Sequence, residues 1–397
     1  MKKIAIALSF VISSSLAISI DEIVNNALNN NYDLKSTQKA ILIANENIKL
    51  ATKWTNPVLS IGANDIHFDE PLKRDSEAMQ AQFIGLSQVI PIGKKLQIKE
   101  SIAKKDKEII SLTLEDKKLL LKSKIYELSY NILILEKKLN LLNSYEKNIK
   151  KLEKLSISLY ENAKNDQNEV LNAKIALSDI LIQKQNLQNT IDNLYLKLEQ
   201  ISYKKIDNIK ESLDIEKLVL NMDISQHPRI IKEELKSQRS RYFGKLEKEN
   251  EIPDIKLNVT YFNRDDKYKD YANVSVNIPL SLYKSEKVRA VKAKLEANEI
   301  DSKLVDLKRT LKIELQVLQN NMNNSYLNYK LINQSIIPLK RKIQKNLENY
   351  NTLNDINATQ MIKNLNELIS FEIKAYDRLE EYFLNYSKSK YYMVKVK

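Results

Sequence analysis

The chain has 397 residues, of which 43% are hydrophobic, and its 64 Lys and Arg residues outnumber 51 Asp and Glu residues, giving a formal net charge of +13 at pH 7. It contains no cysteine, which excludes a disulfide framework, a thiolate zinc site and the acceptor cysteine of an N-terminal lipid anchor. The chain has only 4 Gly and 7 Pro residues, the types that most often end helices and strands. Few short elements and several long helices are therefore expected. The basic residues are scattered without a cluster interleaved with aromatics, which favours solvated helix faces over nucleic-acid binding.

The first residues have the pattern of a secretory signal. Lys2 and Lys3 precede the apolar run 4–12. Small residues at Ser15 and Ala17 stand where a signal peptidase cleaves, so residues 1–17 are predicted to be removed and the mature chain exported. A short buried helix is the alternative interpretation. No later stretch of the sequence offers the roughly 20 apolar residues of a membrane-spanning helix, which leaves a β-barrel as the form of membrane attachment.

The rest of the chain repeats one pattern twice. A helical segment beginning near residue 20 ends before Pro57 and a strand, and a second one beginning near Gln226 ends before Pro253 and another strand. In both halves a second strand and a long helical hairpin follow. We therefore expect repeats at 18–202 and 222–397, joined by a linker at 203–221.

Four strands are predicted, at about 57–64, 81–91, 254–263 and 272–280. Apolar and polar residues alternate strictly in 255–261, which places all apolar side chains on one face. Those faces would be core and solvent in a soluble sandwich, or lipid and aqueous lumen in an outer-membrane barrel. The first-half strands alternate less cleanly, because four apolar residues break the pattern: Phe83, Ile84, Val89 and Ile90.

Four strands cannot close a barrel by themselves. Small closed barrels have about eight strands, and an edge exposed to lipid leaves N–H and C=O groups unpaired at several kcal/mol each. The chain must therefore oligomerise if its strands enter a membrane.

The predicted helices are long enough to form a coiled coil. A continuous helix over 94–163 would extend about 100 Å. Its apolar residues follow a four-three spacing, which is the pattern of a coiled-coil seam: Leu121, Ile125, Leu128, Ile132, Leu135, Leu139 and Leu142. The returning helices keep this spacing except at Lys184 in the first half and Glu372 in the second. Pro338 is expected to break or kink the long helix of the second half.

This duplicated order resembles the TolC-like outer-membrane efflux proteins over essentially the whole mature chain. The resemblance rests on the strand entry 56–59, on the exit 87–95 (Ser-Gln-Val-Ile-Pro-Ile-Gly-Lys-Lys) and on the turn 160–171. The exit is most similar to the heavy-metal branch, although Lys95 stands where Arg is commoner. The resemblance implies a mainly α fold with a small β part, a homotrimer sharing one twelve-stranded transmembrane β-barrel with four strands per chain, and an α-barrel tunnel across the periplasm.

The resemblance also implies that the hairpin tips at 164–168 and 354–357 meet a periplasmic adaptor or line an aperture. Ala163 and Leu353 replace the usual Gly, and Thr359 and Ile362 occupy the places of an acidic gate. Glu169 keeps the charge in the first half, either at the aperture or as a solvated residue favoured by the helix dipole. The candidate tip residues are Tyr160, Ala163, Lys164, Asn165, Glu169, Tyr350, Leu353, Asn354, Asp355 and Thr359.

Other candidate sites are weaker. His67 lies in a predicted loop near Asp65, Asp69 and Glu70, which indicates a solvated loop more than a metal site, so no metal and no cofactor are assigned. His227 precedes a proline at a helix start. The sequence has no Gly-rich phosphate loop and no nucleophile elbow, so no catalytic residue is assigned and an enzyme is not expected. The tyrosines near the C-terminus are interpreted as inter-helix packing and not as an aromatic girdle.

The sequence thus predicts a passive outer-membrane export duct that extends into the periplasm. Its expected partners are an adaptor and an inner-membrane transporter, of an RND-type efflux pump or a type I secretion system, together with outer-membrane lipid and no nucleic acid. Heavy-metal cations, drugs and polypeptides are all open as cargo. The alternative from another class is a periplasmic coiled-coil adaptor protein.

Overall fold

The computed structural model describes residues 18–71, 73–162, 166–350 and 358–393. The described residues fall into two compact units. A helical unit lies within 1–35, 116–227 and 309–397, and a sheet unit lies within 36–115 and 228–308. Each unit therefore takes segments from both predicted repeats. The predicted signal, 1–17, lies outside the described residues, and the repeat boundaries stay predictions.

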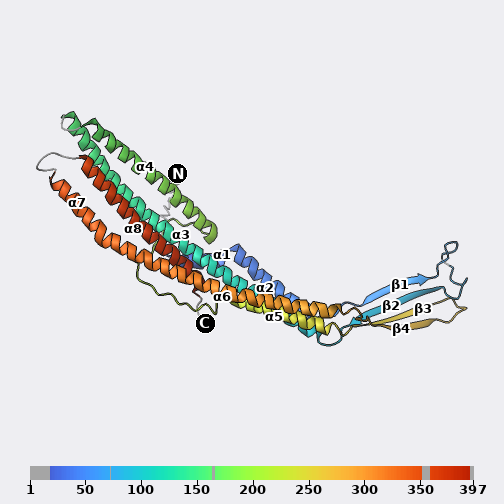
Figure 1. The fold of residues 1–397 in the computed structure, drawn as a ribbon. Helices are drawn as coiled ribbons and strands as arrows, with labels where there is room; N and C mark the ends of the chain where they lie inside the picture. Colours follow the sequence, from blue (N-terminus) through green and yellow to red (C-terminus); the bar gives the residue numbers. More distant parts are fainter. Residues whose placement is uncertain (1–17, 72, 163–165, 351–357, 394–397) are drawn as a thin grey trace, which may run out of the picture. The chain divides into compact units, whose positions relative to one another are not determined.

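Helices form most of the described chain (Figure 1). In chain order the elements are α1 (Ile20–Asn30), α2 (Tyr32–Ala51), β1 (Val58–Asn64), β2 (Ala81–Ile90), α3 (Lys95–Glu161), α4 (Gln167–Ser202), α5 (Pro228–Glu249), β3 (Ile255–Asn263), β4 (Tyr271–Asn277), α6 (Ser285–Leu331), the π-helical turn η1 (Ile332–Ile336), α7 (Ile337–Tyr350) and α8 (Ala358–Tyr392). The first half opens with two helices where one segment was expected, because the Asn31 side chain accepts a hydrogen bond from the Leu34 N–H at 3.1 Å and so starts α2 anew.

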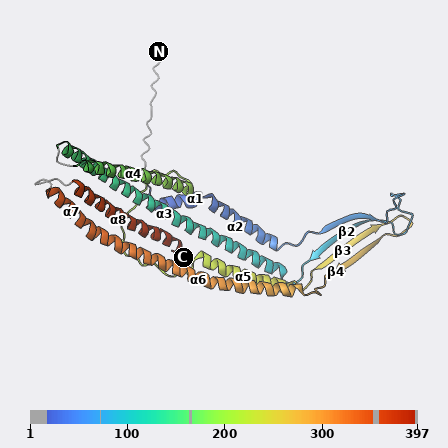
Figure 2. The same ribbon diagram turned by 45° about the horizontal axis from the view of Figure 1, so that its top comes forward.

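The four strands form one antiparallel sheet in the order β1-β2-β3-β4 (Figures 1 and 2). The two strands of the first half thus lie beside the two of the second, and the pairing that joins the halves is between β2 and β3.

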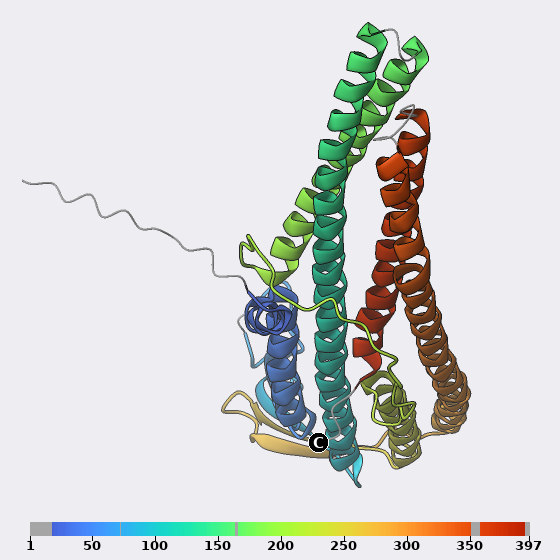
Figure 3. The ribbon, with the colours of Figure 1, turned by 90° about the vertical axis from the view of Figure 1, so that its left-hand side faces the viewer.

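In the helical unit, α8 runs beside α3, and α4 crosses α3 and also contacts α8 (Figure 3). The predicted seam residues of α3 are largely buried, with Ile125 and Ile132 fully so. A second face of α3 is also buried, because the Tyr130 ring stacks on the Phe383 ring of α8 with centroids 4.1 Å apart. Tyr386 adds an edge contact to Tyr130, so the C-terminal aromatics pack between helices as predicted.

The two polar residues that interrupt the apolar spacing, Lys184 and Glu372, each pair with a residue of α3 inside the helical unit. Lys184 of α4 forms an ion pair with Glu146 of α3, which also binds Lys150 at 2.6 Å. Glu372 of α8 is 6% exposed and accepts a hydrogen bond of 2.9 Å from the Tyr145 hydroxyl. The residues that look like defects in the sequence pattern therefore pair across the helices.

The Glu146 bridge predicts a loss of stability in acid. Hydrogen bonds from Lys150 and Lys184 lower the pKa of Glu146 from 4.5 to about 2. Since the folded-state pKa is the lower one, this stabilisation is complete above pH 4.5 and disappears as the pH falls through about 2. Helix melting followed by circular dichroism should show that Glu146→Gln destabilises the protein at pH 7 and that its difference from wild type shrinks toward pH 2. A difference that is constant over this range would contradict the assignment.

Pro338 acts as expected. The proline lacks an N–H and its ring crowds the carbonyl four residues earlier, within η1. The chain widens there into the π-helical turn that separates α6 from α7. α3, which has no proline, is continuous over 67 residues.

Candidate functional site

One face of the sheet is apolar and exposed. The strand register aligns Leu59, Leu86, Val259 and Val274 in one row across all four strands. Their exposed fractions lie between 43% and 68%, so no part of the described chain covers them. Neighbouring rows on this face carry further exposed apolar residues, namely Ile61, Ile84, Tyr261 and Val276.

The opposite face is polar and built from small residues. The register aligns Ser60, Gly85, Thr260 and Asn273 in one row, and the next row contains a hydrogen bond of 3.2 Å from Asn258 Nδ2 to Ser275 Oγ. A soluble sheet with one exposed face would expose this face and cover the apolar one. The observed pattern is that of a sheet with lipid on one side and water on the other.

Aromatic rings lie on the polar face at the end of the sheet nearest the β1–β2 and β3–β4 loops. Phe83, Phe262 and Tyr271 stand in one row, with ring centroids 5.6 Å and 4.7 Å apart. Gly62 completes the row, and a Cβ there would lie 2.6 Å from the Phe83 ring, so a larger residue would displace that ring. This row explains why Phe83 breaks the sequence alternation: it is an aromatic residue on the polar face.

The sheet unit has two open edges. Within the described residues, the outer edges of β1 and β4 have no strand partner. In Figures 2 and 3, α2 and α6 lie on opposite sides of α3 and α5. Both flanking helices expose apolar side chains in this unit: Leu42, Ile43 and Leu50 on α2, and Val288, Val291 and Leu295 on α6. Unpaired strand edges beside apolar helix flanks are surfaces for another chain.

The structure describes only part of the predicted tips. Tyr160 lies in the last turn of α3 and is exposed, and Glu169 lies in the first turn of α4, which Asp166 caps. Tyr350 ends α7 and Thr359 lies in the first turn of α8. The other candidates lie outside the described residues: Ala163, Lys164, Asn165, Leu353, Asn354 and Asp355.

A hydrophobic cluster lies behind the tips and joins the two hairpins. Its buried members come from α3, α4, α7 and α8 and include Ile149, Ala173, Ile337 and Leu365. Ile362, which stands at an acidic gate position of the resembling family, is 6% exposed and belongs to this cluster. That side chain therefore packs inside its own chain.

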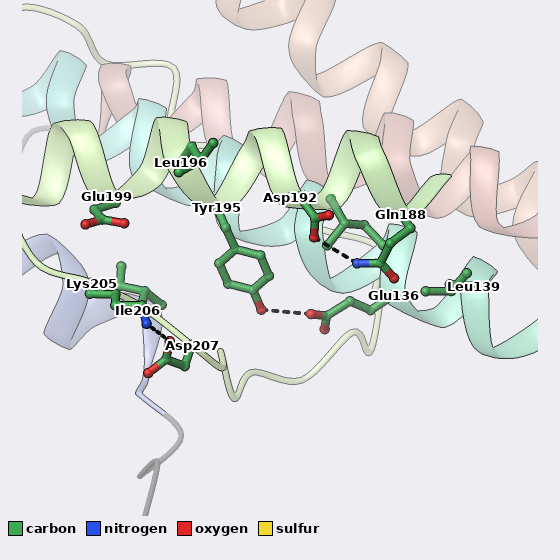
Figure 4. A pocket seen from close by; sticks show the side chains of 11 residues that line it. Glu136, Leu139, Gln188, Asp192, Tyr195, Leu196, Glu199, Lys205, Ile206 and Asp207 are labelled. Atoms are coloured by element: carbon green, nitrogen blue, oxygen red, sulfur yellow. Dashed lines mark hydrogen bonds and ion pairs between the residues drawn. The ribbon is translucent and has the colours of Figure 1, made fainter. Parts of the chain in front are cut away.

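A pocket of about 510 Å³ lies where residues 205–207 meet α3 and α4 (Figure 4). Four carboxylates line it: Glu136, Asp192, Glu199 and Asp207. The Tyr195 hydroxyl donates to Glu136 at 2.7 Å, and burial raises the pKa of this hydroxyl. Its polar groups mostly pair with each other, since Gln188 donates to Asp192 at 2.8 Å and Lys205 lies 3.4 Å from Asp207. These pairs lie within the hairpin or within the connecting segment, and Ile206 of that segment is buried at the edge of the pocket.

The two histidines are placed as follows. His227 is fully buried, with its Nε2 3.3 Å from the Tyr391 carbonyl. The structure brings His67 together with Asp65 and with Glu77, in place of the expected Asp69 and Glu70. Sequence reasoning missed Glu77 because ten residues separate it from His67 and only the path of the loop brings them together. Among the described helices, none combines the length and apolar composition needed to cross a membrane.

Comparisons with known proteins agree with this geometry. A family model described as outer membrane efflux protein matches residues 23–202, whereas no curated protein matches the chain by sequence. The CmeC outer membrane channel of Campylobacter jejuni has a TM-score of 0.78 at 14% identity, over 94% of this chain and 85% of that one. The open-state MtrE channel of Neisseria gonorrhoeae has a TM-score of 0.78 at 11% identity, over 94% and 88%. VceC of Vibrio cholerae has a TM-score of 0.71 at 11% identity, over 92% and 96%. The mainly helical fold with a small antiparallel sheet is thus confirmed.

Proposed function

Because a family model described as outer membrane efflux protein matches residues 23–202 and nearly the whole chain has the fold of outer-membrane channels, we propose that three copies of it form one export channel. In this channel the three sheets close a twelve-stranded barrel, with the apolar row at Val274 facing lipid and the polar row at Asn273 facing the lumen. The helices continue as a tunnel into the periplasm. The protein is a passive duct with no chemistry of its own.

The proposal rests mainly on the sheet, which has one apolar face, one polar face and two outer strands without a strand partner among the described residues. An apolar face with Leu86 and Val274 half exposed or more is unfavourable in water, and burying it in lipid removes that cost. The same strands leave the edges of β1 and β4 unpaired, which lipid does not tolerate. Joining β4 of one copy to β1 of the next pairs these edges, so the apolar face can lie in lipid, and the apolar flanks of α2 and α6 would meet beneath that joint.

The hairpin tips are the part of the chain to which we assign the protein partners. We propose that the tips after Tyr160 and Tyr350 contact a periplasmic adaptor, which links the duct to an inner-membrane transporter. The residues 87–95 favour heavy-metal cations as cargo through their similarity to that branch, and the pump selects what enters. The aperture at Glu169, Leu353 and Thr359 is proposed to lack the acidic gate in the second half.

Purification and conductance test the duct. We expect the full-length protein to extract only with detergent, to have a mass of three chains by light scattering after correction for detergent, and to form conducting pores in planar bilayers. A water-soluble monomer without conductance would contradict the channel and favour the alternative, a periplasmic coiled-coil adaptor.

A further inference from the structure

Three metal-ligating side chains converge in the loop between β1 and β2. One donor atom each from Asp65, His67 and Glu77 lies within 4.8 Å of the other two, and His67 Nε2 is 3.7 Å from Glu77 Oε1. Donors bound to one zinc ion at about 2.1 Å are roughly 3.4 Å apart in a tetrahedral arrangement. Small side-chain movements therefore suffice to bring all three donors onto one ion.

A buried amide fixes the backbone that carries two of these ligands. Gln80 is 2% exposed, and its Nε2 donates to the Asp65 carbonyl at 3.1 Å. Its Oε1 accepts from the N–H of Ser76 at 3.1 Å and from the N–H of Glu77 at 3.4 Å. Asp65 has φ +59°, a conformation that Asp and Asn tolerate better than most residues. One side chain thus holds both ends of the loop at a fixed separation, which is how outer-shell groups orient ligands in metal sites.

The basic side chains at this loop pair with residues other than the three converging side chains. Lys73 binds Glu70 at 2.8 Å, and Arg74 donates to Asn263 at 2.9 Å. Lys267 of the β3–β4 loop binds Asp75 at 2.9 Å. These contacts brace the loop against its neighbour and occupy Glu70, which the sequence had placed beside His67. The pairing within the loop leaves Asp65, His67 and Glu77 grouped with each other.

We propose that Asp65, His67 and Glu77 bind a divalent transition-metal ion of the zinc class, with water completing its coordination. An imidazole nitrogen among three donors suits zinc, whereas calcium and magnesium prefer oxygen donors alone. The His67 and Glu77 side chains are 42% and 56% exposed, so an ion can arrive from solution. The bound ion links the two ends of the loop and restrains it. This site does not depend on the proposed channel.

Zinc binding to the full-length protein tests the site. The protein is purified in detergent with an affinity tag that contains no histidine, and Zn²⁺ is titrated by calorimetry. We expect one ion per chain and at least a tenfold loss of affinity in His67→Ala, in Glu77→Gln and in Asp65→Asn, which keeps the backbone conformation. Asp69→Asn and Glu70→Gln are matched controls in the same loop and should bind as wild type does.

Spectroscopy and proteolysis supply independent readouts. The only other histidine, His227, is fully buried, so imidazole scattering in the zinc X-ray absorption spectrum must come from His67 and should vanish in His67→Ala. Zn²⁺ should slow tryptic cleavage after Lys73 and Arg74 several-fold in wild type and leave the rate in His67→Ala unchanged. Equal zinc affinity in wild type and His67→Ala, or displacement of zinc by an equal concentration of calcium, would overturn the site. His67→Ala should keep wild-type conductance, so failure of the site is distinguishable from failure of the channel.

Discussion

Val274→Arg is expected to abolish assembly of the protein in membranes, whereas Ser275→Arg, one residue along the same strand, is expected to be tolerated. Val274 lies at the centre of β4 in the exposed apolar row, and Ser275 points to the opposite, polar face. An arginine on the lipid face of a barrel costs about 2–4 kcal/mol near the bilayer midplane, and the proposed trimer would carry this cost three times. An arginine in the lumen stays hydrated.

Heat-modifiable migration on gels and the yield of detergent-extracted trimer measure this difference. Ser275→Arg should form trimers and shift the ion selectivity of the pore toward anions, because it adds a ring of positive charge to the lumen. Val259→Arg, in the same apolar row on β3, should repeat the loss seen with Val274→Arg. If Ser275→Arg disrupted assembly and Val274→Arg did not, the two faces would have to be exchanged.

Tyr145→Phe is expected to lower the free energy of unfolding of the helical unit by about 2 kcal/mol. The Tyr145 hydroxyl is the hydrogen-bond donor to Glu372 within a hydrophobic cluster, and its removal leaves that buried carboxylate with less compensation. Arg341 also contacts Glu372 at 2.6 Å, but its side chain is 67% exposed. Arg341→Ala should therefore cost less than about 1 kcal/mol.

The double variant Tyr145→Phe with Glu372→Leu separates polar pairing from packing. Replacing both partners by apolar groups removes the unpaired carboxylate and restores the apolar spacing of α8, so the double variant should be close to wild type in stability. Denaturant unfolding followed by circular dichroism measures all variants. Additive losses in the double variant would show that the network contributes packing and no specific polar pairing.

The alternation of apolar and polar residues was enough to predict which side chains lie on each face of β3. For the strands of the first half, the same assignment needed the tertiary structure. In 255–261 each side chain's face follows from its position in the chain, because successive residues of a strand point to opposite sides. Phe83 violates the alternation, and only its pairing with Phe262 explains it as a ring on the polar face. The order β1-β2-β3-β4 likewise depends on pairing between residues more than 160 apart.

Helix length, the hairpin seams and the effect of Pro338 were readable from the chain by itself, since periodicity and proline geometry are local properties. The sequence also established that four strands need further strands to close. Tertiary structure alone revealed that Lys184 and Glu372 pair across helices, that Ile362 is buried, and that Glu77, not Glu70, stands beside His67. The strands and the long helices follow from local periodicity, whereas the proposed duct rests on the family resemblance. Which charges compensate one another, and which side chains meet at one point, depends on distances between segments that no local pattern encodes.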